Sequence, residues 1–150
     1  MYSLYILNGP NLNLTGTRDN VIYGTETLQQ IEEHCQGQAK KLGYSVDFRQ
    51  TNHEGILIDW VQEARTSASG LIINGGGLTH TSISLMDALK ALTIPVVEVH
   101  LSQIFAREQF RHWSYVAQAA QGVIAGFGAN GYTIAMEAIG SLITQREQQR

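Results

Sequence analysis

The sequence predicts an α/β fold in which an open, five-stranded parallel sheet carries helices on both faces. Short apolar runs alternate along all 150 residues with segments whose apolar positions recur every three or four residues. The run Leu71–Ile73 is apolar throughout, as expected for a strand buried on both sides. Because crossover connections in parallel sheets are right-handed, the strand order 2-1-3-4-5 is favoured. We therefore expect a single domain over residues 1–150.

Five strands and four main helices account for the alternation. The strands are predicted at Leu4–Leu7, Tyr44–Arg49, Leu71–Ile73, Val96–Leu101 and Gly122–Gly126. The helices are predicted at Leu28–Leu42, Leu57–Ala68, Ile83–Leu92 and Gly131–Gln145, with a short helix and turn within Ser102–Tyr115. Gly43 and Gly70 are expected to end the first two helices. A flavodoxin-like sheet of this kind binds ligands beyond the carboxyl ends of its strands, at the switch point between strands one and three.

Charge and cysteine content exclude several classes of protein. The net charge of −3 and the pI of about 5.9 argue against a nucleic-acid-binding surface, which needs clustered Lys and Arg. The single cysteine, Cys35, cannot form an internal disulfide and favours a reducing compartment. No apolar run approaches the roughly 20 residues of a membrane span. We expect a cytoplasmic enzyme with neither a membrane nor a nucleic-acid partner.

The loop Asn8–Gly24 is the most informative stretch of the chain. Connections from strand to helix usually take roughly 2–6 residues, and one of about fifteen is typical of a lid or a binding loop. Arg18 lies five residues before Tyr23, so a guanidinium and a phenol share this loop. Because a nearby cation favours the charged tyrosinate, the pair is expected to form a base with its charge partner. A surface loop with a core-facing tyrosine is the alternative interpretation.

Polar residues also follow the third and fourth strands, at the same edge of the sheet. Asn74 and three glycines give a backbone that a ligand can approach closely, and His80 in the same loop is expected to contact that ligand. Glu98 and His100 are two residues apart on one strand, so both point to one face. There the carboxylate can orient the imidazole for acid–base work. Arg111 is expected either to hold a substrate oxygen or to be solvated.

Several motifs that would assign a more specific function are incomplete or absent. Residues 126–131 match G-x-G-x-x-G, but only nineteen residues follow Gly131, too few for the second strand and ribose-binding acid of a dinucleotide site. These glycines are therefore expected at turns and at a helix–sheet contact. No G-x-x-x-x-G-K-[ST] phosphate loop is present, and the histidines lack the spacing of a zinc site. The sequence thus predicts neither a cofactor nor a metal.

Four motifs together resemble those of type II 3-dehydroquinase, the small 3-dehydroquinate dehydratase. They are Asn8-Gly9-Pro10-Asn11-Leu12-Asn13-Leu14 with Arg18 and Tyr23; Asn74 with Leu78-Thr79-His80-Thr81-Ser82; Glu98-Val99-His100 with Ser102; and Ala106-Arg107-Glu108 with Phe110-Arg111 and Ser114-Tyr115. Four spaced motifs in the family's order are far more specific than any one of them, and they cover nearly the whole chain. The family implies dehydration of 3-dehydroquinate to 3-dehydroshikimate through an enolate, a step of the shikimate pathway.

The resemblance assigns a role to each matching residue. Tyr23 corresponds to the base, with Arg18 as its cation. His100, oriented by Glu98, would protonate the leaving hydroxyl, and Asn11 would hold the water that stabilises the enolate oxygen. The substrate-binding residues implied by the family are Asn74 with the amides of Leu101 and Ser102 for the carboxylate, His80 and Arg111 for the ring hydroxyls, and Asp87 from a neighbouring subunit. The family is typically a dodecamer built from trimers.

This chain departs from the family's common residues at several positions, which are Asp19-Asn20, Met86, Gln103, Phe105 and Ala117-Gln118. None has a named chemical role, so the departures concern lid movement, subunit contacts and turnover rate more than the reaction. Two competing interpretations are a flavodoxin-like module for a mononucleotide or flavin and a catalytically weak relative. The Arg18–Tyr23 pair and the Glu98–His100 pair favour an enzyme, because a binding module needs neither a base nor an acid.

Overall fold

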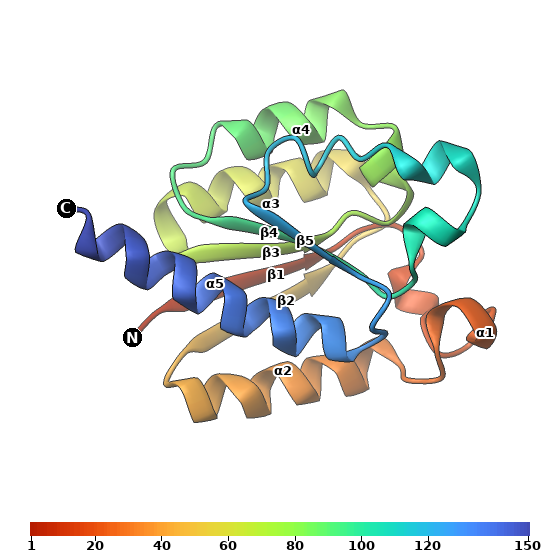
Figure 1. The fold of residues 1–150 in the computed structure, drawn as a ribbon, viewed down its shortest axis with the longest axis horizontal. Helices are drawn as coiled ribbons and strands as arrows, with labels where there is room; N and C mark the ends of the chain where they lie inside the picture. The colour runs from red at the N-terminus through yellow and green to blue at the C-terminus, as the bar shows by residue number, and fades with distance from the viewer.

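The computed structural model describes residues 1–150, and a sheet of five parallel strands in the order β2-β1-β3-β4-β5 forms its centre (Figure 1). The strands are β1 (Ser3–Asn8), β2 (Ser45–Gln50), β3 (Gly70–Asn74), β4 (Val96–His100) and β5 (Gly122–Ala125). The main helices are α2 (Leu28–Leu42), α3 (Glu54–Ser67), α4 (Ile83–Lys90) and α5 (Asn130–Gln148). The predicted fold class and strand order are confirmed.

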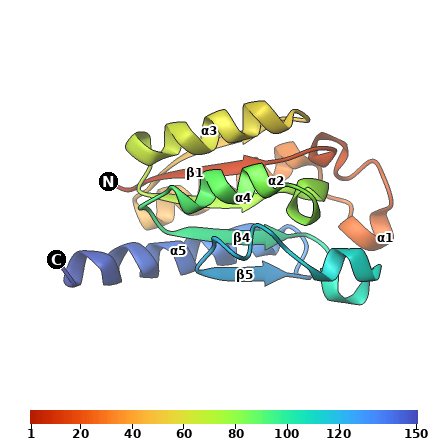
Figure 2. The same cartoon turned by 90° about the horizontal axis from the view of Figure 1, so that it is seen from above.

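Helices cover both faces of the sheet, with α2 and α5 on one face and α3 and α4 on the other (Figures 1 and 2). Residues of β1 alternate between the two cores: Leu4 and Ile6 pack with α2 and α5, and Leu7 packs with α3 and α4. Every residue of β3 is buried, which explains its apolar sequence. The carboxyl ends of the strands therefore meet at one edge, where the long loops gather.

Local sequence signals set the helix ends. Thr27 and Gln30 form a reciprocal capping box at the start of α2, and Gly43 ends that helix in the left-handed conformation, as predicted. The Ser82 hydroxyl accepts a hydrogen bond from the Leu85 amide at the start of α4. The prediction that Gly70 ends a helix is wrong. Gly70 begins β3, where a Cβ atom would lie 2.8 Å from the Ile139 side chain of α5.

The helix at the C-terminus is longer than predicted. It runs to Gln148 because Arg146 and Glu147 favour a helix and hold other elements, Arg146 donating to the Thr93 carbonyl and Glu147 accepting from Tyr2. No strand follows β5, and Gly131 packs against Val99 at the start of α5. This confirms that the G-x-G-x-x-G match marks turns and a helix–sheet contact.

Short helical turns shape the loops at the carboxyl edge of the sheet. They are η1 (Leu12–Leu14), α1 (Asn20–Tyr23), η2 (Gly76–His80), η3 (Ile104–Ala106) and η4 (Gln109–His112). In Figure 2, α1 and the segment of η3 and η4 lie at the end toward which the strands point. None of the helices is long and apolar enough to cross a membrane.

Candidate active site

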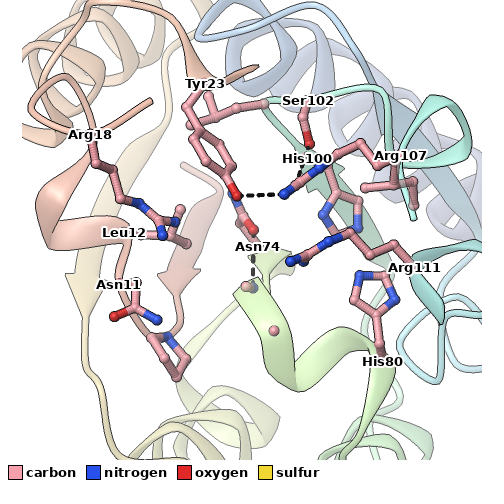
Figure 3. Close-up of a pocket in the computed structure, with 15 residues that line it drawn as sticks. Asn11, Leu12, Arg18, Tyr23, Asn74, His80, His100, Ser102, Arg107 and Arg111 are labelled. Carbon is pink, nitrogen blue, oxygen red and sulfur yellow. Dashed lines mark hydrogen bonds between the residues drawn. The ribbon is translucent and has the colours of Figure 1, made fainter. Parts of the chain in front are cut away.

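A pocket opens beyond the carboxyl ends of β1, β3 and β4 (Figure 3). Its lining comes from the loop after β1, the Gly-rich turn η2, and the end of β4 with the segment that follows it. The pocket thus lies at the switch point that the strand order predicts. Nine predicted site residues line it: Asn11, Arg18, Tyr23, Asn74, His80, His100, Leu101, Ser102 and Arg111.

The Tyr23 side chain projects from α1 into the pocket, between two guanidinium groups. The central carbon of Arg18 lies 4.5 Å from the centroid of the Tyr23 ring, and that of Arg107 lies 5.1 Å away. Arg107 also donates from Nη2 to the phenol oxygen at 2.9 Å and from Nη1 to Ser102 Oγ at 3.1 Å. Arg107 therefore ties the loop after β1 to the end of β4 through the oxygen of the predicted base (Figure 3).

The loop that carries Tyr23 is braced by its own backbone. Gly16 and Gly24 adopt positive φ angles, and at Gly16 a Cβ atom would lie 2.9 Å from the backbone of Glu26. With its amide nitrogen turned toward them, Asn20 donates to the carbonyl oxygens of Gly16 and Gly24, each 3.2 Å away. Asn20 stands where type II 3-dehydroquinases, which the sequence resembles, commonly have proline. Here the two hydrogen bonds of the Asn20 side chain close the loop, where the family has a proline ring.

Glu98 and His100 form a buried pair on β4, as their spacing predicts. His100 Nε2 lies 2.8 Å from Glu98 Oε2, and both side chains are almost inaccessible to solvent. Val97 and Val99 point to the opposite face and pack in the α2/α5 core. His100 alone of the pair lines the pocket, because Glu98 lies behind it. A carboxylate in this position fixes which ring nitrogen carries hydrogen.

His80 and Arg111 come from different segments and point into the pocket together (Figure 3). His80 Nδ1 lies 2.8 Å from the Trp113 carbonyl oxygen, and burial lowers the pKa of His80 below its ordinary value. Arg111 donates from Nε to Glu108 at 2.5 Å, and this bond lowers the pKa of Glu108. A neutral imidazole and a guanidinium at one wall suit the hydroxyl groups of a small ligand.

The floor of the pocket rests on a buried chain of hydrogen bonds. Asn74 donates from Nδ2 to the Tyr132 hydroxyl at 3.0 Å, and that hydroxyl donates to Asn8 Oδ1 at 2.6 Å. Asn74 Oδ1 accepts from the Gly76 amide, which leaves one Nδ2 hydrogen for a ligand. The backbone amides of Leu101 and Ser102 make no hydrogen bond within the chain. Three donors thus converge at one end of the pocket.

The lining is cationic although the chain carries a net negative charge. Three guanidinium groups and two imidazoles line the pocket, and no carboxylate does. A site built this way attracts a small anion and disfavours a cation. Within the whole structure, no group of three or more His, Cys, Asp or Glu side chains is arranged to hold a metal ion.

Comparison with known proteins points to one family. The sequence profile of the family described as dehydroquinase class II matches residues 2–140. A 3-dehydroquinate dehydratase of Caulobacter vibrioides is 56% identical over 140 residues, which are 93% of this chain and 96% of that protein. The chain belongs to the class II dehydroquinase family. It is therefore an enzyme of the hydro-lyase class, and the predicted resemblance is confirmed.

Two further class II dehydroquinase relatives agree in sequence and in structure. A 3-dehydroquinate dehydratase of Dinoroseobacter shibae is 53% identical over 145 residues, 97% of each chain. The crystal structure of the type II dehydroquinase of Butyrivibrio crossotus superposes with a TM-score of 0.91 at 37% identity, covering 93% of this chain and 97% of that one. The likeness extends over the full fold rather than one motif.

Asp87 and the departures from the dehydroquinase pattern lie away from the pocket. Asp87 borders a groove between α3 and α4 with Arg65 and Ser84. It contributes nothing to the pocket of its own chain. None of the departing residues lines the pocket either: Asp19, Asn20, Met86, Gln103, Phe105, Ala117 and Gln118.

Sequence reasoning missed two residues of this dehydroquinase site. Arg107 stands in the Ala106-Arg107-Glu108 motif without a predicted role, and Tyr132 is not among the predicted site residues. The available signal for Arg107 was its place in the segment after the fourth strand, which returns to the pocket. Tyr132 had no local signal, because a buried phenol in a helix is indistinguishable by pattern from an ordinary core residue.

Proposed function

We propose that this protein dehydrates 3-dehydroquinate to 3-dehydroshikimate by anti elimination through an enolate, in the shikimate pathway. The observation that carries the proposal is that two groups share one pocket. One is a phenol whose oxygen accepts a hydrogen bond from a guanidinium, and the other is an imidazole hydrogen-bonded to a carboxylate. Those two groups come from Tyr23 with Arg107 and from His100 with Glu98. They supply the base and the acid that an elimination of water requires.

Tyr23 acts first, as the base. Its tyrosinate removes a proton from the carbon next to the substrate ketone, and the electron pair moves onto the ketone oxygen to form an enolate. The Arg107 hydrogen bond to the phenol oxygen and the Arg18 guanidinium over the ring place positive charge beside the group that becomes a tyrosinate. Asn11 at the pocket wall would hold a water molecule against the enolate oxygen.

His100 completes the reaction as the acid. The enolate electrons return to form the carbon–carbon double bond, and the C1 hydroxyl leaves with a proton from the imidazolium as water. Glu98 stabilises that imidazolium and holds the ring in place. Both residues return to their starting protonation states when the Tyr23 phenol gives up its proton to solvent and the His100 imidazole takes one from solvent.

Substrate orientation follows from the donors in the pocket. The carboxylate would lie against Asn74 and the free amides of Leu101 and Ser102, and the ring hydroxyls against His80 and Arg111. The cationic lining supports an anionic substrate. A neutral His80 can accept a hydrogen bond from a hydroxyl, which an imidazolium could not.

The proposal extends to assembly and location. Asp87 would reach the pocket of a neighbouring subunit within a dodecamer of four trimers. Its position in an outer groove, with no carboxylate lining the chain's own pocket, supports donation across an interface. A cytoplasmic location is supported by Cys35, the single cysteine, which forms no disulfide.

Metal-free protein mixed with 3-dehydroquinate provides the test. A rise in ultraviolet absorbance from the conjugated enone product is expected. A flat trace from folded protein would overturn the proposal and leave the catalytically weak relative. The mononucleotide- or flavin-binding interpretation predicts instead that flavin fluorescence is quenched when protein is titrated into flavin, and that no enone forms.

A further inference from the structure

Two consecutive residues, Trp113 and Ser114, are linked to the two histidines of the pocket, one directly and one through Glu98. The Trp113 carbonyl oxygen lies 2.8 Å from His80 Nδ1. The Ser114 hydroxyl donates to Glu98 Oε1 at 2.5 Å, and the other oxygen of Glu98 lies 2.8 Å from His100 Nε2. One short segment therefore contacts His80 directly and reaches His100 through Glu98.

This segment is itself fixed in place. The Tyr115 amide donates to the Thr79 carbonyl at 2.8 Å, and Val116 is fully buried in the α3/α4 core. The Ala117 amide donates to Ser114 Oγ at 2.9 Å. Because an amide already occupies the acceptor side of the Ser114 hydroxyl, its one hydrogen is directed at Glu98. The carboxylate is thus held from both of its oxygens.

These contacts give the two rings opposite hydrogen-bonding roles. A carbonyl oxygen only accepts, so His80 carries its hydrogen on Nδ1 and leaves Nε2 free as an acceptor. A carboxylate only accepts, so His100 carries hydrogen on Nε2. Nδ1 of His100 is then the free nitrogen, and it donates when the ring is charged. The centroids of the two rings lie 6.3 Å apart.

We propose that the Trp113 carbonyl assigns the role of His80, and that Ser114, by holding Glu98, is a positioning residue for the proton donor His100. The proposal rests on the dehydratase function proposed above. Glu98 is completely buried, and Ser114 is the only partner of its Oε1. Without the Ser114 hydroxyl that oxygen has no hydrogen bond, the carboxylate is free to rotate, and the His100 ring loses its fixed orientation.

Three variants test the role of Ser114. Ser114→Ala removes the hydroxyl, Ser114→Thr retains it, and Ser69→Ala is a matched control at the opposite end of the sheet, where Ser69 Oγ accepts from the Ser3 amide. In Ser114→Ala we expect kcat to fall about 10–100-fold with KM within about twofold, because His100 acts in the transition state. Ser114→Thr should recover most of kcat. Unchanged kcat in Ser114→Ala would overturn the proposal, as would a loss confined to KM.

Nitrogen-15 spectra of the histidines supply a readout that general destabilisation does not change. Wild-type protein should show the Nδ1–H form for His80 and Nε2–H for His100, with His80→Gln and His100→Gln used for assignment. Ser114→Ala should alter the His100 signals alone. Nε2–H on His80, or an unaltered His100 spectrum in Ser114→Ala, would contradict the proposal.

The two readouts separate this proposal from the proposed function. If wild type fails to turn over 3-dehydroquinate, the dehydratase function fails, while the spectra of the resting protein still decide the ring assignment. If Ser114→Ala does not fold, the wild-type spectrum and the kcat of Ser114→Thr decide the matter: Nε2–H on His100 with near-wild-type kcat supports the proposal, and either one missing overturns it.

Discussion

At the scale of single residues, the Tyr23 phenol is the group on which contacts from separate segments converge. Arg18, from the same loop, lies over the ring face, whereas Arg107, eighty-four positions away, donates to the oxygen itself. The oxygen is the atom whose charge changes when a tyrosine acts as a base. Arg107 is therefore placed to stabilise that charge directly, and Arg18 to support it through the ring.

Arg107→Ala should lower kcat/KM by about 10–150-fold, since a hydrogen bond to a charged group is worth roughly 1.5–3 kcal/mol. Steady-state dehydration of 3-dehydroquinate measures it. Arg150→Ala, at the exposed C-terminus, is the control and should match wild type. If Arg18→Ala lost activity while Arg107→Ala kept it, the oxygen partner during turnover would be Arg18 instead.

The sequence predicts well which residues line the pocket. It predicts less well which of their atoms contact one another. Asn74 and His100 end strands, and His80 follows one; because the ends of these strands must converge, the place of all three residues follows from topology. The Arg107 contact depends on how two irregular loops fold over each other, and no periodicity encodes that. Tyr132 supports the pocket floor from within a helix core, where its hydroxyl is visible only once the partners Asn8 and Asn74 are known.

At the scale of elements, the loops after β1 and β3 pack backbone against backbone. The Gly9 amide donates to the Asn74 carbonyl at 2.8 Å, and a Cβ atom on Gly9 would lie 2.5 Å from the Gly75 carbonyl oxygen. The second contact leaves no room for a side chain at Gly9. The relative position of the base and the carboxylate-binding end therefore depends on this glycine.

Gly9→Ala should separate the two loops, lowering the free energy of unfolding by about 1–3 kcal/mol and reducing turnover. Gly37→Ala is its matched control, because Gly37 lies inside α2 with no atom within 4 Å of the added Cβ. That variant should be more stable by about 0.5–1 kcal/mol with unchanged activity. Urea denaturation and the enone assay measure both. Equal behaviour of the two variants would show that the loop contact is not tight.

An ion-pair network fastens β2 to α3. Arg49 donates to Asp47 and Glu63, and the bond from Arg49 holds the pKa of Glu63 at about 2, against an ordinary 4.5. A carboxylate with a depressed folded pKa stabilises the protein fully above its unfolded pKa and loses that effect as the pH falls through the folded value. The network is thus expected to weaken only in acid, between about pH 4.5 and pH 2.

Glu63→Gln should lower the urea midpoint at pH 7, and its difference from wild type should narrow as the pH falls from about 5 toward 2. Glu33→Gln, an exposed carboxylate of α2 outside any ion pair, is the control. A difference that stayed constant across this range would mean that the charge of Glu63 does not contribute to stability.

Most elements were predictable because strands and helices have different apolar periods, and these are clear in this chain. Boundaries were less so. Gly70 resembles a helix terminator by type, yet tertiary packing against Ile139 places it in β3. The end of α5 is extended by contacts to Tyr2 and Thr93, which lie far away in sequence.

At the scale of the whole molecule, the pocket of one chain lacks a carboxylate, and Asp87 faces outward from the α3/α4 groove. Neither periodicity nor composition encodes an assembly, so the sequence gives no direct sign of a neighbour. The proposed dodecamer makes each site composite, with Tyr23 from one subunit and Asp87 from another.

Subunit mixing tests that arrangement. Asp87→Asn and Tyr23→Phe oligomers should each be weakly active. Co-refolded at equal ratio, they should recover activity because about a quarter of the sites would combine an intact Tyr23 with an intact neighbouring Asp87. Sedimentation confirms that mixed oligomers have formed. No recovery in mixed oligomers would place Asp87 outside the neighbouring site.

The central claim is that this pocket performs the dehydration with Tyr23 as its base. The most direct measurement compares enone formation from 3-dehydroquinate by wild type, Tyr23→Phe and Tyr44→Phe. Tyr44 precedes β2 at the opposite end of the sheet, so its loss of a hydroxyl is a control. We expect Tyr23→Phe to lose about 10²–10⁴-fold in kcat with its fold intact, and Tyr44→Phe to match wild type. Tyr23→Phe activity within about tenfold of wild type would contradict the account.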